Sequence, residues 1–386
     1  MEDAVHIVIK STLSRVDGTS RNNYTFPWRS GRALIGSIVG TGHHATVSRL
    51  CDASTGAPLP LCIRSINTKI SPRATRNELF GLRLQLRYGT SCFGILRVLQ
   101  YGSYVHDRDI AVRSSTGNGP MGDALCVFDH SCPPSPPVNI AKYLYCVMPM
   151  CVGGDLFQLI TTPDALSRIS AHRVRLLVRW LLKTLVSLKE NRIIHGDIKP
   201  ENICFLRRGK ENMPAIDSAS LVDFGLSKRL SLSNKPHGVY YGAGTPGYMA
   251  PEVVWNTENP TTRKECSFPV DVFSAGITLF VFCLDWMTSK HRVGAYFPGQ
   301  ELYNTYNTSL FASNCTDKRD ELRKAILGKI ATYHTYFPRN QDVISVVRVL
   351  VDVIAPMMRP IVLYRPSACT QLHVLNKIPL RFSRGF

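Results

Sequence analysis

The residues best suited to chemistry in this sequence lie together between Arg192 and Phe205, in the pattern H-x-D-x-K-x-x-N. Apolar residues on both sides of the pattern predict a short polar loop anchored on two buried strand-like segments. Within the loop, Asp197 can accept a proton from a hydroxyl, Lys199 can neutralise a transferring phosphate, and Asn202 can hold a metal ion. These side chains together suit phosphoryl transfer.

Two further motifs follow. Asp223-Phe224-Gly225 places a second carboxylate between the apolar Leu221-Val222 and a glycine, and residues 244–252 read G-T-P-G-Y-M-A-P-E. In this order the motifs resemble the H-R-D, D-F-G and A-P-E signatures of the eukaryotic-type protein kinases. That resemblance implies an α+β, two-lobed protein kinase fold, with a small β-rich N-lobe and a larger helical C-lobe.

The resemblance also implies the chemistry. ATP and Mg²⁺ are the expected cofactors, with Asp197 and Lys199 catalytic and Asn202 and Asp223 holding the metal. Lys199 and the wording G-T-P-x-Y-M-A-P-E look like serine/threonine kinases rather than tyrosine kinases. The expected partners are therefore protein substrates with serine or threonine hydroxyls.

A glycine-containing stretch lies upstream of these motifs. Aligned to the kinase pattern G-x-G-x-x-G-x-V, it matches at Gly40, Gly42, Ala45 (in the third glycine position) and Val47. Glycines allow backbone N–H groups to approach phosphate oxygens. By this resemblance the stretch covers the nucleotide, and Val47 lies over the adenine.

The strand that follows departs from the family pattern. Arg64 stands where kinases carry a lysine that contacts the α- and β-phosphates. Arginine keeps the charge but aims its donors differently, and Lys69 is an alternative cation. The segment from Ser71 to Gly89 has helix-capping residues at both ends, and its Glu78 is placed to pair with the strand cation.

The stretch Tyr143–Leu156 resembles the strand and hinge that border the kinase nucleotide. The match places Met148 at the back of the nucleotide pocket. It implies that the backbone of Cys151 hydrogen-bonds the adenine edge and that Asp155 hydrogen-bonds the ribose. From Ser170, apolar residues recur at three- and four-residue steps and predict a long helix that leads to His195.

The activation segment runs from Asp223 to Glu252. Most kinases have an arginine before the catalytic aspartate to bind a phosphate on this segment, and here that residue is Gly196. We therefore predict activity that does not depend on phosphorylation of the segment. Two structural roles are also implied: Asp271 should bond the catalytic-loop backbone, and Arg365 should pair with Glu252.

The expected organisation is an N-terminal extension (1–30), a kinase domain (31–375) and a C-terminal tail (376–386). The N-lobe is expected at about 31–151 and the C-lobe at about 152–375. Strands are expected at 5–9 and 96–105, and an insertion at 106–138 is rich in Gly, Pro, Ser and Asp. Helices are expected at 318–333 and 343–354.

Composition sets the remaining expectations. The formal charge of +18 favours acidic partners, although the basic residues are dispersed and nucleic acid is not required. The twelve cysteines form no C-x-x-C pair, which indicates free thiols. The longest uncharged apolar run, Phe273–Leu284, is too short to span a membrane, and no signal peptide is evident. We expect a monomer in the nucleus or cytoplasm that needs no membrane.

Gly196 and the long inserted loops also resemble the serine/threonine kinases that herpesviruses encode and carry in the virion tegument, which would place the protein in a host cell. Three alternatives stay open. Arg64 suits a pseudokinase scaffold, the H-x-D and Asn core also occurs in small-molecule phosphotransferases, and the charge suits nucleic-acid binding.

Overall fold

The structure is a computed structural model, and it describes residues 6–9, 31–41, 45–67, 72–104, 143–230, 239, 242–289 and 341–379. The expected insertion at 106–138 and the expected helix at 318–333 lie outside these residues. The chain divides into two compact units: residues 1–89 with 96–150, and residues 90–95 with 151–386. Each unit is described by itself.

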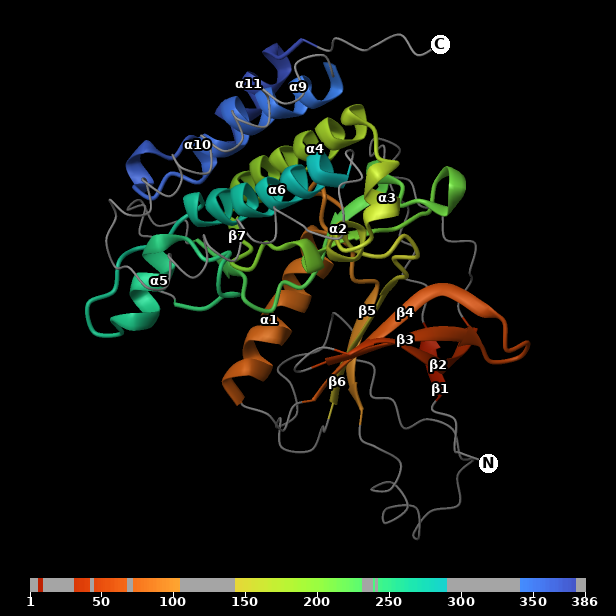
Figure 1. Cartoon of the computed structure of the whole chain (residues 1–386). Helices are drawn as coiled ribbons and strands as arrows, with labels where there is room; N and C mark the ends of the chain where they lie inside the picture. The colour runs from red at the N-terminus through yellow and green to blue at the C-terminus, as the bar shows by residue number, and fades with distance from the viewer. Residues whose placement is uncertain are drawn as a thin grey trace, which may run out of the picture. The chain divides into compact units, whose positions relative to one another are not determined.

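The first unit is built on one antiparallel sheet of six strands in the order β1-β2-β3-β4-β6-β5 (Figure 1). Its core is formed by side chains that alternate along the central strands, such as Leu61 and Ile63 with Tyr145 and Val147. The strands are β1 (His6–Ile9), β2 (Gly31–Thr41), β3 (Ala45–Asp52), β4 (Pro58–Asn67), β5 (Gln100–Tyr104) and β6 (Tyr143–Pro149).

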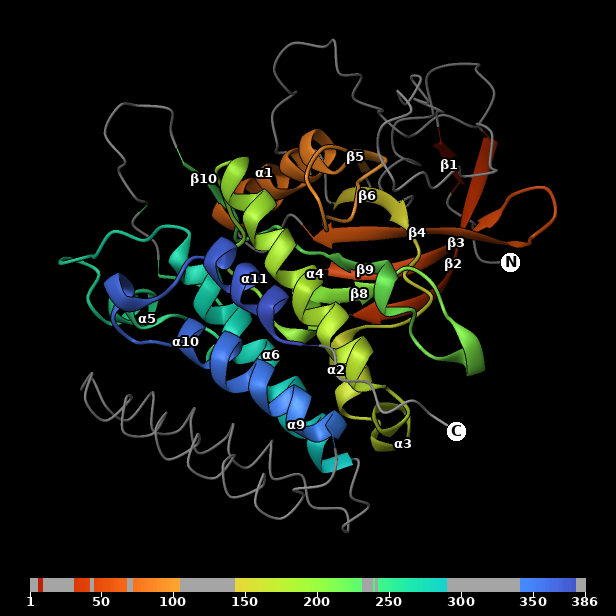
Figure 2. The same ribbon diagram turned by 90° about the horizontal axis from the view of Figure 1, so that it is seen from above.

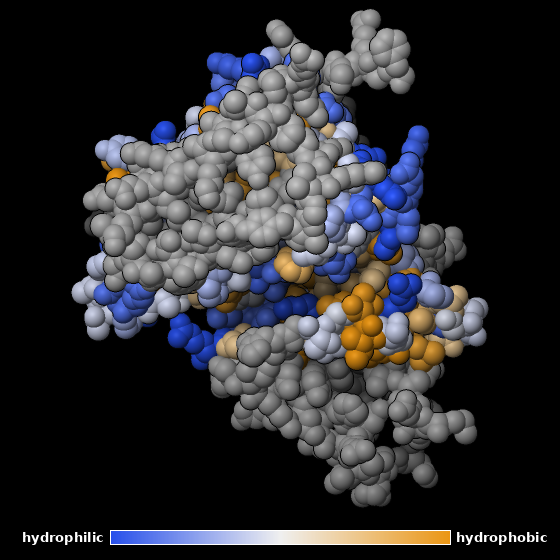
Figure 3. All heavy atoms as spheres, viewed as in Figure 1, coloured by the Kyte–Doolittle hydropathy of each residue, from blue (hydrophilic) through white to orange (hydrophobic). Residues whose placement is uncertain are grey.

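The one helix described in the first unit, α1, spans Pro72–Tyr88. It begins at the predicted proline, and Gly89 follows its last residue, so the capping signals located both ends. β5 begins at Gln100, four residues later than the expected strand at 96–105. Ile38 and Val39 of β2 are 67% and 47% exposed, and hydrophobic surface shows over the strands of this unit in Figure 3.

The second unit is mainly helical. α4 and α6 form its centre, and α11 packs against α4 (Figure 2). The α-helices are α2 (Leu156–Ile160), α3 (Pro163–Ser167), α4 (Ala171–Glu190), α5 (Pro251–Glu258), α6 (Pro269–Ser289), α9 (Gln341–Arg348), α10 (Ala355–Met357) and α11 (Ala368–Lys377).

Short strands and turns connect these helices. Two two-stranded sheets pair β7 with β10 and β8 with β9. The elements are β7 (Ile193–Ile194), β8 (Ile203–Phe205), β9 (Ala219–Leu221) and β10 (Lys228–Arg229), the 3₁₀ turns η3 (Pro200–Asn202), η4 (Lys210–Asn212), η5 (Ile216–Ser218) and η7 (Val362–Tyr364), and the π-helix η6 (Val349–Ile354).

Three boundaries differ from the sequence prediction. Residues 90–95 belong to the second unit, because Phe93 donates its N–H to Ser187 and Gly94 accepts from the N–H of Leu221. The expected helix at 343–354 changes from α-helix to π-helix at Val349. α11 continues to Lys377, two residues into the expected tail.

Helix α6 contains the apolar run that the sequence singled out. Over Pro269–Met287 it is long and apolar enough to suit a membrane span, but that window is entirely buried within the protein. It is therefore a core helix. Its position matters for the site, because Asp271 lies in its first turn.

Candidate active site

One buried carboxylate, that of Asp271, holds the backbone of the loop that carries Asp197. Asp271 accepts the backbone N–H of His195 at 2.7 Å and that of Gly196 at 2.9 Å, as the sequence predicted. Burial raises the pKa of Asp271, whereas His195 and the two N–H donors act in the opposite direction. Gly196 has a φ of 81°, a left-handed conformation that favours glycine. The backbone at this position is therefore well suited to glycine.

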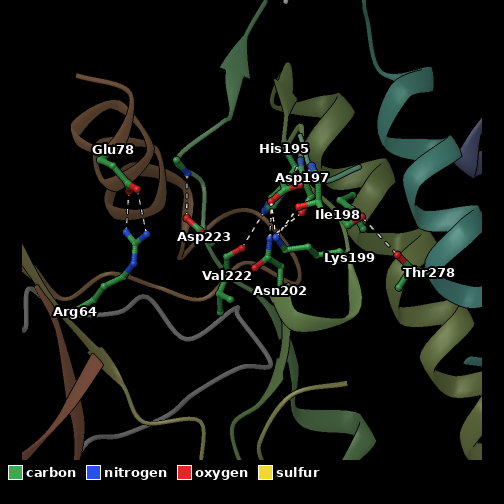
Figure 4. Close-up of polar contacts among 12 residues, drawn as sticks. Arg64, Glu78, His195, Asp197, Ile198, Lys199, Asn202, Val222, Asp223 and Thr278 are labelled. Carbon is green, nitrogen blue, oxygen red and sulfur yellow. Dashed lines mark hydrogen bonds and ion pairs between the residues drawn. The ribbon is translucent and has the colours of Figure 1, made fainter. Parts of the chain in front are cut away.

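Asp197 lies at the centre of a polar cluster (Figure 4). One oxygen of its carboxylate accepts the N–H of Thr245 at 2.7 Å, and the other lies 3.1 Å from the ammonium of Lys199. Lys199 also donates to the hydroxyl of Thr245 at 2.6 Å. These contacts join the catalytic loop to the activation segment, and they hold the carboxylate in one orientation.

Asn202 ties the same loop together. Its Nδ2 donates to the carbonyl of Asp197 at 2.8 Å and lies 3.4 Å from the Asp197 carboxylate. The carbonyl of Asn202 accepts the N–H of Val222 at 2.9 Å. Since Asp223 follows Val222 directly, this bond brings the second carboxylate beside the loop, although more than twenty residues separate the two in sequence.

The turn at Asp223 is held by His195 and Phe224. His195 is fully buried, its Nε2 is 3.0 Å from the carbonyl of Val222, and its ring meets the edge of Phe224 at 4.6 Å between centroids. Asp223 has a φ of 62°, which a residue with a side chain rarely adopts. The packing of Phe224 and the bonds of Val222 on either side hold this conformation.

The donor set here fits Mg²⁺. Asp197, Asp223 and Asn202 offer carboxylate and amide oxygens, the ligands that this ion prefers. The Nδ2 of Asn202 is used within the loop, so its Oδ1 is the atom left to face an ion; no bond to it occurs among the described residues. Those residues contain no cluster of three or more His, Cys, Asp or Glu that would suit a different kind of metal site.

In the first unit, Arg64 of β4 and Glu78 of α1 form the ion pair that the sequence predicted. Two parallel bonds of 2.8 and 3.2 Å join them, and the side chains are 15% and 13% exposed. Arg64 also pairs through its backbone with Val47 of β3. The planar fork of arginine therefore matches the glutamate with both of its donors.

The predicted glycine-rich stretch forms the end of the β2–β3 hairpin. Gly40 pairs with Val47, and a side chain at Gly40 would meet open space. Ala45 and Val47 are both half-buried in β3. Gly42 lies outside the described residues, as does Lys69, so the structure reports on Arg64 alone of the two cations considered.

The predicted hinge residues lie near residue 150, where the chain passes from the first unit to the second. Met148 is a buried residue of β6, and Cys151 is the half-buried first residue after the first unit. Asp155 has a function that the sequence analysis missed: it caps α2, with its Oδ1 accepting the N–H of Gln158 at 2.7 Å. The signal was an aspartate directly before a helical segment.

Two further positions complete the described site. Arg365 meets Glu252 in two bonds of 2.7 and 3.1 Å and is buried, as predicted. Thr245, the threonine of the G-T-P-G motif, was given no contact in the sequence analysis, and it contacts both Asp197 and Lys199. Its place inside the G-T-P-G motif was the available signal.

Comparison with known proteins accords with this geometry. Residues 137–328 match the protein kinase domain family. That match covers just under half of the chain. The β-sheet unit and the helical unit are those of a two-lobed protein kinase fold, and the chain is similar to eukaryotic-type serine/threonine kinases.

The proteins that the chain is similar to include calcium/calmodulin-dependent protein kinases. Calcium/calmodulin-dependent protein kinase type II of Caenorhabditis elegans is 30% identical over 171 residues, 42% of this chain and 21% of that protein. Calcium/calmodulin-dependent protein kinase cmkB of Emericella nidulans is 34% identical over 141 residues, 36% of this chain and 31% of that protein. The chain thus spans a third or less of the length of these relatives.

Proposed function

We propose that this protein is a serine/threonine protein kinase that transfers the γ-phosphoryl group of ATP to a hydroxyl of a protein substrate. The observation that supports this best is the position of the Asp197 carboxylate, held between the Thr245 N–H and the Lys199 ammonium. A base for an incoming hydroxyl and a cation for a phosphate stand side by side there.

Each residue then has a defined task. Asp197 orients the substrate hydroxyl and takes its proton, and Lys199 balances the charge of the transferring phosphate. Asn202 and Asp223 hold Mg²⁺, which supplies charge neutralisation at the phosphates when bound. Asp271 keeps the loop rigid through the two backbone bonds described above.

The nucleotide roles in the first unit and the hinge are part of the same proposal. Gly40, Gly42, Ala45 and Val47 cover the nucleotide, while Met148 and the backbone of Cys151 border the adenine. Arg64 contacts the phosphates, with Lys69 as the alternative cation. Asp155 keeps one carboxylate oxygen for the ribose while the other caps α2.

The direct test is Asp197→Asn in the full chain, assayed by transfer of labelled phosphate from Mg-ATP to a mixture of serine and threonine peptides. We expect turnover to fall by about a hundred- to ten-thousand-fold, because the proton acceptor is lost. Asp217→Asn is the matched control, since Asp217 is an exposed partner of Arg207. Equal activity of the two variants would contradict the proposal.

A second candidate is a pseudokinase scaffold that binds nucleotide weakly, because Arg64 replaces the usual lysine. Comparing phosphate transfer by the wild type, Arg64→Lys and Lys69→Ala separates the two functions. Activity of the wild type excludes a purely structural role. An inactive wild type that gains activity on Arg64→Lys would favour the scaffold.

Substrates, partners and origin are also proposals. The charge of +18 favours acidic targets, whereas the exposed Glu201 beside the catalytic loop favours a basic residue near the target hydroxyl. A peptide array with purified protein decides between them. The herpesvirus resemblance, with its placement in a host nucleus, cytoplasm or tegument, rests on Gly196 and the inserted loops, and finding the gene in a viral or a cellular genome tests it.

A further inference from the structure

The segment after α5, residues 259–266, folds back onto that helix around one buried amide. Asn256 is 1% exposed, and its Oδ1 accepts the N–H of Lys264 at 2.6 Å while its Nδ2 donates to the carbonyl of Lys264 at 2.8 Å. The same Nδ2 lies 3.3 Å from the sulfur of Cys266. The side-chain amide thus bonds the backbone of Lys264 as a neighbouring strand would.

Trp255 contacts two residues of the same segment, Thr262 and Lys264. Its indole N–H donates to the carbonyl of Thr262 at 3.0 Å, and the ammonium of Lys264 lies 4.2 Å from the centre of its ring. Asn256 and Trp255 are consecutive in α5, so one turn of helix sets the path of the whole segment. The result is a strand-like edge that ends at the fully buried Cys266.

That edge pairs with the activation segment. Val239 donates its N–H to the carbonyl of Cys266 at 2.8 Å and accepts the N–H of Cys266 at 3.0 Å, forming an isolated antiparallel bridge. Three residues later, Gly242 passes so close to α5 that an added Cβ would lie 2.7 Å from the backbone nitrogen of Thr257 and 2.8 Å from the carbonyl carbon of Asn256. Two contacts made by the backbone therefore fix the segment just before Thr245.

Thr245 is where the activation segment reaches Asp197 and Lys199. Gly196, the neighbour of Asp197, has no side chain to receive a phosphate, and its left-handed φ disfavours any residue that has one. The contacts described for Val239, Gly242 and Thr245 are backbone bonds, close packing against α5 and the Lys199–Thr245 hydrogen bond.

We propose that residues 259–266, organised by Asn256, are a permanent clamp that holds the activation segment in its working position without phosphorylation. Asn256 is a positioning residue in this arrangement, because it acts on Thr245 and Asp197 through the segment. The proposal rests on the proposed kinase function for its activity tests, but the clamp itself can be tested without any activity.

The first experiment treats the full-length wild type with a phosphatase and verifies by intact mass that no phosphate remains. Peptide phosphorylation should stay within about threefold of the untreated protein, and so should that of a variant with alanine at Ser231, Ser233, Tyr240 and Tyr241. A larger loss in either would overturn the proposal. A wild type inactive before treatment would contradict the proposed function instead.

The second experiment compares Asn256→Ala with Asn191→Ala, which removes an amide that donates to the carbonyl of Ser187 in α4, outside the clamp. Loss of the Asn256 bonds should lower kcat/KM for peptide by about ten- to a hundredfold, because each of the lost hydrogen bonds is worth about two- to tenfold. KM for ATP should change less than twofold, and circular dichroism at the assay temperature should show the same folded fraction in both variants, so that the loss of activity is not a loss of folding. Equal effects of the two variants would overturn the clamp.

The third experiment needs no activity and covers the case in which Asn256→Ala does not fold. Gly242→Ala should push the activation segment off α5, whereas Gly209→Ala has room for its Cβ, with the nearest atom at 3.7 Å. Backbone hydrogen exchange at Val239 and Cys266 should accelerate at least tenfold in Gly242→Ala relative to Gly209→Ala. Unchanged exchange at both amides would overturn the proposal.

Discussion

Two arginine–glutamate pairs in this chain have nearly the same geometry, and they differ in what surrounds them. Arg365 and Glu252 in the second unit meet at 2.7 and 3.1 Å, and Arg64 and Glu78 in the first unit meet at 2.8 and 3.2 Å. The side chains of the former pair are 0% and 5% exposed, whereas those of the latter are 15% and 13% exposed.

The guanidinium of Arg365 is enclosed by additional acceptors. It donates to the carbonyls of Arg359, Pro269 and Pro360, and it lies 5.0 Å from the ring centre of Phe273. These partners belong to α6 and to the turn before α11, so the pair joins segments that are distant in sequence. Such full satisfaction is what makes a buried ion pair tolerable.

The comparison teaches that geometry alone does not assign a function to an ion pair. The enclosed pair is structural, because no ligand can reach it without unfolding its surroundings. The partly exposed pair links β4 to α1 and keeps water access, which suits a cation that must also meet a nucleotide. Four predictions test this distinction.

The largest effect is expected for Arg365→Ala. Removing the arginine leaves Glu252 buried without its partner, so the free energy of unfolding should fall by about 3–5 kcal/mol. Urea denaturation of the full chain, followed by fluorescence, measures it. A loss below 1 kcal/mol would show that the pair is not structural.

Asp285, a buried acid with no arginine partner among the described residues, extends the comparison of buried and exposed charges. The Oδ1 of Asp285 in α6 has no hydrogen-bond partner among the described residues, and burial raises the pKa of Asp285 to about 7. Because the folded-state pKa is above the ordinary value of 3.8, the folded protein binds the extra proton, and this group's contribution to stability is lost as the pH rises from about 4 to about 7.

Asp285→Asn should remove that pH dependence. The difference in unfolding free energy between variant and wild type should shift in favour of the variant by up to about 4 kcal/mol between pH 4 and pH 8. Denaturation curves at both pH values measure it. A constant difference at the two pH values would mean that Asp285 is charged at both.

A moderate effect on activity, with little on stability, is expected for Arg64→Ala. KM for ATP should rise and kcat/KM should fall by about ten- to a hundredfold, because a charge-assisted contact to phosphate is lost. Steady-state kinetics at varied ATP measure this. The opposite pattern, a large loss of stability with unchanged KM, would place Arg64 with Arg365 as a structural residue.

The smallest effect is expected at the exposed pair of Arg207 and Asp217, whose side chains are 53% and 69% exposed. Arg207→Ala should change the free energy of unfolding by less than about 1 kcal/mol. It serves as the baseline for the Arg365 measurement in the same urea assay. A loss comparable to that of Arg365→Ala would remove burial as the explanation of the difference.

Much of the fold was predictable because local signals agreed with the final packing. α1 begins at its predicted proline, and Ser170 caps α4 as the apolar periodicity indicated. The pairings of Arg64 with Glu78 and of Arg365 with Glu252 were predicted from the resemblance. The helix predictions rest on capping residues and periodicities that one stretch of chain carries by itself, whereas the two pairings rest on the family resemblance.

The sequence analysis did not predict several contacts that the structure shows. Residues 90–95 joined the second unit through bonds to Ser187 and Leu221, which no local pattern announces. Thr245 became a partner of Lys199, and Asn256 became the organiser of a segment eight residues away. Apart from the place of Thr245 in the G-T-P-G motif, none of these contacts has a periodicity or a spacing that could be read from the sequence.

The order and wording of the motifs determined which side chains could do chemistry, because residue type fixes charge, donors and acceptors. The long helices were likewise determined locally, because a repeated apolar face has few ways to be buried. Only the tertiary structure decided that residues 90–95 bond to Ser187 and Leu221, that Asn256 bonds the backbone of Lys264, and that Val239 is bridged to Cys266. Those outcomes depend on which backbone groups meet when distant segments pack, and a backbone group carries no mark of its partner in the sequence.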